Sequence, residues 1–215
     1  MFRANDKTKD QSYFLFATTQ EQLDFLRFPL GSLTKNETRD FAKKLGLNVH
    51  DKKDSQDICF IPNGDYKSFI KLNAKEGNVI DKSGKVLGKH DGIHNFTIGQ
   101  RRGMGIASEK PLYVVDIIKD TNEIIVGDKE HLLGQSLILD ELNFIMPDID
   151  ISAPTLKIKC SAKIRSLSTP SEGTLYKKEN TYSFIFDNPT ESITRGQACV
   201  LYDNERVLGG GIIKQ

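Results

Sequence analysis

The stretch from residue 155 to 165 constrains the fold more than any other, because apolar and polar residues alternate there without interruption. A period of two is the side-chain period of a β-strand, whose successive side chains point to opposite faces. The apolar set predicts a buried face and consists of Leu156, Ile158, Cys160, Ala162 and Ile164. Cys160 is therefore interpreted as a structural residue of the core.

The remainder of the last third shows further short strand patterns, at residues 182–186, 198–202 and 206–213. The three consecutive glycines 209–211 permit the sharp bending that a barrel corner needs. Short strands at regular spacing predict a small closed antiparallel β-barrel over residues 133–215.

The polar face of the 155–165 strand carries a row of basic side chains. Two interpretations explain this row. A solvated sheet edge guarded by lysine explains the row, and so does attraction to an RNA backbone. Arg165, which is followed by Ser166, is the member that we single out for phosphate contact, because a guanidinium matches phosphate geometry. The row consists of Lys157, Lys159, Lys163 and Arg165, with Ser161 among them.

Residues 66–132 predict a small central domain with β-hairpins. Residues 79–81 and 86–88 flank a Lys-Ser-Gly-Lys turn, and residues 112–118 and 123–126 form two further strands. Between the hairpins, glycines bracket the pair Arg101-Arg102. This loop is either a turn with solvated arginines or a basic loop whose backbone approaches phosphate. It is not a P-loop, because no Gly-Lys-Ser/Thr follows.

Residues 1–65 predict helices that have no sheet of their own to cover. Segments 18–21 and 34–37 each match a capping box, with Thr18 and Thr34 as the N-caps. The second helix carries an apolar face and ends at Gly46. Too few strands are present to complete an α/β layer, so this segment is expected to be the tail of a larger α/β domain.

Composition excludes several classes of protein. The net charge of +1 creates no global attraction to nucleic acid or membrane, and no apolar run approaches the ~20 residues of a membrane span. Three widely spaced cysteines argue for a reducing, cytoplasmic setting rather than a disulfide scaffold. His90 and His94 are separated by Gly92 in a segment of loop and strand, so no metal site is predicted.

Two short segments remain open on their residues alone. Cys59 lies in the apolar run 58–61, before a Pro-Asn-Gly-Asp turn. It is either a small core hydrophobe or a nucleophilic thiol at the mouth of a pocket. The trio Lys9, Asp10 and Gln11 is either a solvated or capping segment or a ligand contact.

Several stretches together resemble the tRNA-specific 2-thiouridylases, sulfurtransferases that thiolate the wobble uridine of tRNA. They follow the family's order along essentially the whole chain. They are Lys-Asp-Gln-Ser-Tyr-Phe-Leu (9–15), Phe-Pro-Leu-Gly (28–31), Asp-Ser-Gln-Asp-Ile-Cys-Phe-Ile-Pro (54–62), Phe-Thr-Ile-Gly-Gln-Arg-Arg-Gly (96–103), Tyr-Val-Val (113–115) and Gly-Gln-Ala (196–198). The resemblance implies an α+β chain: the end of an ATP-binding α/β domain (1–65), a central domain (66–132) and a C-terminal β-barrel (133–215).

The resemblance also implies roles for individual residues. In the family, the cysteine of the Ser-Gln-Asp-Ile-Cys-Phe motif accepts sulfur as a persulfide, which places this role on Cys59. It then forms a transient disulfide with a second cysteine that has no counterpart in this chain. The segments that match tRNA contacts of the family contain Lys9, Asp10, Gln11, Arg165, Ser166 and Gln197. Ser166 departs from the aromatic residue that often follows the arginine in the family.

Family members carry a phosphate loop of the Ser-Gly-Gly-x-Asp-Ser type, which this sequence lacks. The resemblance therefore implies ATP held by a region outside the chain, tRNA as substrate, and a sulfur-relay protein or cysteine desulfurase as partner. We expect a cytoplasmic monomer without membrane contact that represents the C-terminal part of such an enzyme and is inactive alone. The alternative is a non-catalytic RNA-binding β-barrel module in which Cys59 is structural.

Overall fold

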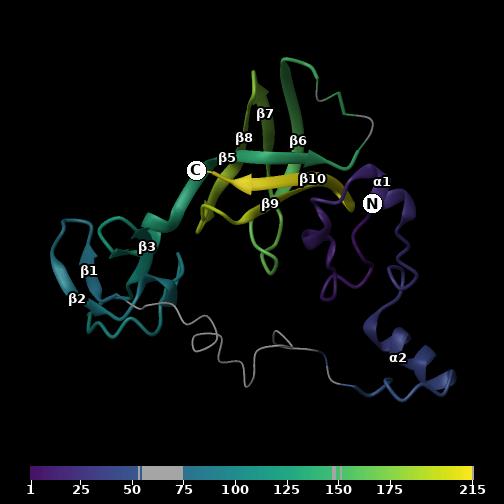
Figure 1. Cartoon of the computed structure of the whole chain (residues 1–215), viewed down its shortest axis with the longest axis horizontal. Helices are drawn as coiled ribbons and strands as arrows, with labels where there is room; N and C mark the ends of the chain where they lie inside the picture. Colours follow the sequence, from purple (N-terminus) through teal and green to yellow (C-terminus); the bar gives the residue numbers. More distant parts are fainter. Residues whose placement is uncertain (53, 55–74, 147–148, 151, 215) are drawn as a thin grey trace. The chain divides into compact units, whose positions relative to one another are not determined.

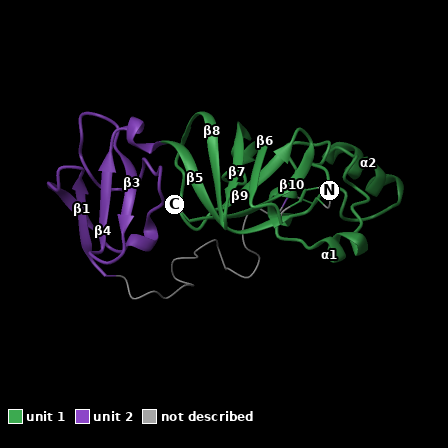
Figure 2. Cartoon of the chain, turned by 90° about the horizontal axis from the view of Figure 1, so that it is seen from above, with its two compact units in different colours: residues 1–52, 134–215 green, residues 53–133 purple. Residues whose placement is uncertain are grey.

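The computed structural model describes residues 1–52, 54, 75–146, 149–150 and 152–214. The chain divides into two compact units (Figure 2), one formed by residues 1–52 with 134–215 and the other by residues 53–133. The first unit therefore joins the N-terminal segment to strands that lie more than a hundred residues later in the sequence.

The larger unit is built on a closed barrel in the strand order β10-β5-β8-β7-β6-β9 (Figure 1). Strand β6 pairs antiparallel with β7 and β9, and β10 pairs antiparallel with β5 and β9. The predicted closed antiparallel barrel is thereby confirmed. The strands are β5 (Leu133–Phe144), β6 (Thr155–Lys163), β7 (Ser171–Lys178), β8 (Thr181–Glu191), β9 (Ala198–Asp203) and β10 (Arg206–Ile213).

Apolar side chains from all six strands fill the barrel. Cys160 and Ala162 of β6 are buried there, as their alternation predicts. Phe184 and Phe186 of β8 meet edge to face, with ring centroids 4.9 Å apart. Because each buried phenylalanine contributes about 1.5–3 kcal/mol of transfer free energy, this interior is the main source of stability of the unit.

Strand β9 is buried on both of its faces. Leu201 points into the barrel, whereas Val200 and Tyr202 belong to a second apolar cluster outside it, together with Tyr13. The cover is residues 1–16, which we call the N-terminal strap; it contains the 3₁₀-helix η1 (Ser12–Leu15). The strap is joined to β10 by a backbone hydrogen bond from Val207 N to Met1 O at 3.0 Å. Just before β10, the Glu205 carbonyl oxygen accepts a second one from Arg3 N at 2.8 Å.

The strap changes the outer face of β6 from the one that the sequence predicted. The basic row was expected to lie along one outer face, but Ser161 and Lys163 are only 8% and 7% exposed. Ser161 Oγ donates to the Tyr202 carbonyl oxygen of β9, and Lys163 lies over the ring of Tyr13 in the strap. Lys157 and Lys159 remain exposed, and Lys159 Nζ donates to Asp187 at 2.7 Å. The row is thus divided into a covered and a solvated half.

Two α-helices follow the strap: α1 (Gln20–Phe25) and α2 (Lys35–Lys44). The capping box of α2 at Thr34 is confirmed, but that of α1 was predicted one residue too early. Thr19, not Thr18, is its N-cap. Thr18 is held in the preceding turn, because its carbonyl oxygen accepts a hydrogen bond from Asn143 Nδ2 at 3.1 Å. The N-cap of α1 is therefore Thr19, and Thr18 is engaged in a tertiary hydrogen bond instead.

The smaller unit contains a four-stranded sheet in the order β2-β1-β4-β3. The two predicted hairpins, β1–β2 and β3–β4, are confirmed, and a parallel pairing of β1 with β4 joins them. The elements are β1 (Gly77–Asp81), β2 (Val86–His90), η3 (Ile93–Asn95), β3 (Tyr113–Ile118), β4 (Glu123–Gly127) and η4 (Lys129–Leu132). Val79, Val114 and Ile124 form the fully buried centre of this sheet, and Met104 packs against them.

Gly209 provides a test of barrel closure. Its φ is +147°, and a Cβ added there would lie 2.0 Å from Asn143 O on β5. We expect Gly209→Ala to destabilise the unit by about 2–6 kcal/mol through backbone strain and overlap. Gly196→Ala, at φ +80° with open space around it, should cost only about 1–2 kcal/mol. Urea unfolding followed by circular dichroism measures both; equal losses would contradict the predicted close approach of β10 and β5.

Candidate nucleic-acid interface

The predicted persulfide cysteine, Cys59, lies outside the residues that the structure describes. All other predicted site residues belong to the barrel unit. The strap carries Lys9, Asp10 and Gln11, the turn after β6 carries Arg165 and Ser166, and Gln197 directly precedes β9. Residues from three distant parts of the sequence therefore meet in one compact unit.

Asp10 is the anchor of the strap. Its side chain is 2% exposed and forms an ion pair with Arg3, whose Nε lies 3.0 Å from Asp10 Oδ2. The same carboxylate accepts hydrogen bonds from Ala4 N at 3.2 Å, from Ser12 N at 3.1 Å and from Ser12 Oγ at 3.1 Å. The structure thus places Asp10 inside the strap, where it organises the backbone around its neighbours Lys9 and Gln11.

The electrostatics of Asp10 follow from these contacts. Burial alone would raise the pKa of Asp10, but the hydrogen bonds from Arg3, Ser12 and Ala4 outweigh burial, so the pKa is lowered. Arg3 also lies over the ring of Tyr202, with its guanidinium carbon 5.4 Å from the ring centroid. The carboxylate is therefore ionised, and its ion pair is seated on the outer face of β9.

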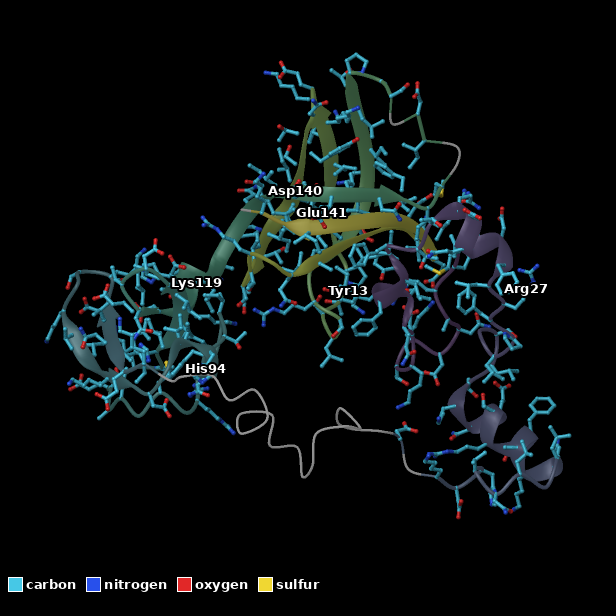
Figure 3. The ribbon with its side chains drawn as sticks, viewed as in Figure 1. Tyr13, Arg27, His94, Lys119, Asp140 and Glu141 are labelled. Carbon is cyan, nitrogen blue, oxygen red and sulfur yellow. The ribbon has the colours of Figure 1, made fainter. Side chains whose placement is uncertain are left out.

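Tyr13 connects the strap to both other parts of the site (Figure 3). Its hydroxyl donates to the Ala198 carbonyl oxygen at 2.8 Å, next to Gln197. Burial raises the pKa of Tyr13 to about 12, and the nearby positive charge of Arg165 opposes that rise. Lys163 Nζ lies 5.9 Å from the centroid of the Tyr13 ring. Tyr13 is thus the contact through which the strap, the β6–β7 turn and the start of β9 come together.

Arg165 is held in a defined position rather than fully extended into solvent. Its Nη2 donates to Thr194 Oγ1 at 3.0 Å and to Ser192 O at 3.3 Å. The backbone N–H of Gln197 donates to Thr194 O at 3.3 Å, so Arg165 and Gln197 are tied to the same loop. Arg165 as a whole is half-buried.

Lys9, Gln11 and Gln197 are exposed, whereas Ser166 is half-buried. The exposed side chains combine one ammonium with two amides, which suits a polyanion that is contacted through phosphate, sugar and base edges. The covered residues Asp10 and Tyr13 give this surface its shape.

Two exposed apolar residues at the same site were missed by the sequence analysis. Phe14 is 67% exposed and directly follows Tyr13, and Leu167 is 98% exposed in the turn after Arg165. An exposed aromatic ring beside basic and amide groups is a platform on which a base can stack. The sequence feature that could have identified Phe14 and Leu167 was their position next to predicted contact residues. Nothing in the spacing of Arg3 indicated that it would pair with Asp10.

The two cysteines that the structure describes are unsuited to nucleophilic chemistry. Cys160 and Cys199 are free thiols buried in the barrel interior. Burial raises the pKa of Cys160 to about 12, and burial together with Cys160 also raises the pKa of Cys199. A thiol reacts as its thiolate, so both should be inert in the folded barrel.

Within the described ranges, no group of three or more histidine, cysteine or acidic side chains is arranged to hold a metal ion. None of the helices in these ranges is long and apolar enough to cross a membrane.

Comparison with known proteins finds three family models that together span nearly the whole chain. Residues 1–63 match the family model described as a tRNA methyl transferase HUP domain, and residues 67–128 match the tRNA methyl transferase PRC-barrel domain. Residues 134–213 match a model described as an aminomethyltransferase beta-barrel domain. The three matches follow one another along the chain with only short gaps.

The chain belongs to the tRNA-specific 2-thiouridylase family. It is 46% identical over 220 residues to a protein of Hyphomonas neptunium named tRNA-specific 2-thiouridylase MnmA, covering 99% of this chain and 56% of that relative. Proteins of the same name from Caulobacter vibrioides and Nostoc punctiforme are 48% and 43% identical over 98% and 100% of the chain. The chain spans 57% and 61% of their lengths, so it corresponds to little more than half of each relative.

The lowered pKa of Asp10 predicts a pH-dependent contribution to stability. An acid whose pKa is lower in the folded state stabilises the fold above its unfolded pKa of about 3.9, and this contribution is lost as pH falls through the folded value. Asp10→Asn should therefore lower the free energy of unfolding at pH 7 by about 1–3 kcal/mol. The difference from the unaltered chain should shrink below about pH 4.

Asp187→Asn is the matched control, because it removes a carboxylate from an exposed ion pair with Lys159. It should cost less than about 1 kcal/mol at pH 7. Denaturant unfolding at several pH values measures both variants. Equal effects at pH 7 would show that Asp10 does not anchor the strap.

Proposed function

We propose that this chain is the tRNA-binding and sulfur-carrying part of a tRNA 2-thiouridylase, which replaces the 2-oxygen of the wobble uridine by sulfur. The observation that carries the proposal is the identity of 43–48% over 98–100% of the chain. A match of this length includes all the segments that the sequence analysis singled out, Cys59 among them. The gathering of the predicted contact residues in the barrel unit supports it independently.

In this proposal the contact residues of the barrel unit bind tRNA. Lys9 and Arg165 contact phosphates, and Gln11 and Gln197 donate and accept hydrogen bonds with sugar or base groups. Asp10 acts indirectly, by holding the strap in place. Ser166 contributes through the backbone of its turn. Such contacts offset the few kcal/mol that unstacking a target base costs.

Cys59 carries the sulfur in this proposal, as a persulfide. Its terminal sulfur attacks C2 of the uracil ring, and the bond from C2 to the activated oxygen breaks. A second cysteine then attacks the Cys59 sulfur, which cleaves the sulfur–sulfur bond, leaves sulfur on the base and joins the two cysteines in a disulfide. A reductant later restores both thiols. The inert, buried state of Cys160 and Cys199 supports the assignment of this role to Cys59.

ATP supplies the activation of the uracil oxygen by adenylation, with AMP as the leaving group. We place its binding outside this chain, because the sequence contains no Ser-Gly-Gly-x-Asp-Ser phosphate loop. A sulfur-relay protein or cysteine desulfurase is the proposed sulfur donor. A reducing, cytoplasmic setting suits the free thiols of the barrel.

The intact mass of the chain tests the role of Cys59. After incubation with a cysteine desulfurase, its relay protein and cysteine, we expect the mass to increase by one sulfur atom. Cys59→Ser should abolish this gain, whereas the control Cys160→Ala should retain it, because the Cys160 thiol is buried. A gain that persists in Cys59→Ser, or no gain on a folded chain, would contradict the proposal.

Thiol reactivity distinguishes the proposal from the alternative of a non-catalytic RNA-binding module. In the folded protein, iodoacetamide should modify Cys59 rapidly and Cys160 and Cys199 only after unfolding, because a buried thiol with a raised pKa reacts slowly. Peptide mapping of the labelled protein gives the order of modification. If Cys59 is protected to the same extent as the two barrel cysteines, the alternative is favoured.

A further inference from the structure

The glycine-bracketed loop between η3 and β3 has a defined conformation that the proposed function does not use. Gly99, Gly103 and Gly105 all have positive φ, at +86°, +79° and +67°. These values lie in the left-handed region that glycine adopts without a steric penalty. The chain therefore turns sharply three times within seven residues, and Arg101 and Arg102 lie between the first two turns.

Gln100 closes the loop from within. Its Oε1 accepts a hydrogen bond from Thr97 N at 3.0 Å, and its Nε2 donates to Arg102 O at 2.9 Å. Its backbone carbonyl accepts a hydrogen bond from the N–H of Val114, a buried residue of β3, at 2.9 Å. One side chain thus joins both ends of the turn that presents the arginines, and its own backbone is fixed to the sheet.

Met104 anchors the other end of the loop. It is buried in the apolar centre of the smaller unit, whereas its neighbours Gly103 and Gly105 are exposed. Together, Gln100 and Met104 hold the backbone on either side of Arg101 and Arg102. The two guanidinium groups therefore project from a fixed base.

The two arginines are not paired with an acidic side chain in the part of the chain that the structure describes. Both are exposed, and among the described residues neither lies within ion-pair distance of a carboxylate. Arg101 borders a pocket of about 300 Å³, together with Ser108 and Lys110. Glu109 also lines this pocket, so two cationic groups and a hydroxyl face a single carboxylate there. With Arg102 beside it, the surface is positively charged on balance.

We propose that the Arg101-Arg102 turn is a second RNA-contact site, which binds phosphate groups of the RNA backbone. The choice of RNA as the source of the phosphate rests on the proposed function. Guanidinium groups bind phosphate oxygens through paired hydrogen bonds, and Ser108 and Lys110 beside Arg101 supply further donors. A loop that is already ordered loses less conformational entropy when it binds, which favours contact over two freely solvated side chains.

Binding of tRNA to the full 215-residue chain, measured by fluorescence anisotropy over a series of salt concentrations, tests the site. We expect Arg101→Ala combined with Arg102→Ala to weaken binding about tenfold and to reduce the salt slope by about 1–2, because two phosphate contacts are lost. The matched control is Lys82→Ala combined with Lys85→Ala. It removes the same charge from an exposed turn of the same unit.

The outcomes separate this inference from the function on which it rests. If the unaltered chain does not bind tRNA, the proposed function is wrong, and RNA cannot be the ligand of the Arg101-Arg102 site. If the unaltered chain binds and the arginine and lysine double variants weaken binding equally, only the Arg101-Arg102 site is wrong. If ATP binds the unaltered chain but not the arginine variant, while the variant binds tRNA as tightly as the unaltered chain, the loop is a nucleotide site and RNA contact is overturned.

Gln100 is a positioning residue in this proposal, and its role has a separate signature. Gln100→Ala leaves the charge of the loop unchanged but removes both hydrogen bonds that close it. We expect affinity for tRNA to fall about 2–10-fold, with the salt slope preserved. A loss of affinity accompanied by a reduced slope, or no loss in a chain with an unaltered circular dichroism spectrum, would contradict the positioning role.

Discussion

The buried carboxylate of Asp10 is the interaction on which the barrel unit depends for its surface. It neutralises Arg3, closes the strap through Ser12 and Ala4, and places both charges against the outer face of β9. A buried charge is tolerated only when it is paired and hydrogen-bonded, and Asp10 satisfies both conditions. Removal of that carboxylate would leave Arg3 without its partner above Tyr202, so strap and strand are coupled energetically as well as by packing.

This coupling explains why β9 is apolar on both faces and why β6 carries a buried lysine. A barrel strand normally has one face toward the core and one toward water, but the strap replaces water over Val200 and Tyr202. Lys163 is covered in the same way, and burial lowers its pKa while Asp10 opposes that effect. The surface proposed for RNA is consequently not the open face of the barrel. It is the rim where the strap, the β6–β7 turn and the loop before β9 meet.

Much of this organisation could be predicted from local patterns. The period of two at residues 155–165 identified the barrel strand, its inward residues and the structural nature of Cys160, and turn residues identified both hairpins of the smaller unit. Local patterns failed at a helix boundary and where a distant segment intervened. Thr18 was predicted as the N-cap of α1, but Thr19 is the N-cap, and the Thr18 carbonyl oxygen accepts a hydrogen bond from Asn143 instead. Ser161 and Lys163 showed the spacing of an exposed face, but both are buried, and Lys163 lies under Tyr13 of the strap.

The sequence by itself determined the strand periodicity, the capping signals and the resemblance of its motifs to the thiouridylase family, because these depend on residues that are neighbours along the chain. The sequence identified Lys9, Asp10, Gln11, Arg165 and Gln197 as candidate contact residues, but it did not indicate which of them are buried and which are exposed. Only the tertiary structure decided that Asp10 lies inside the strap while Lys9 and Gln11 face outward. The reason is physical: Asp10 pairs with Arg3 across a turn of the strap, and the strap packs against β9, a strand far away in the sequence, so no periodic pattern along the chain records either contact.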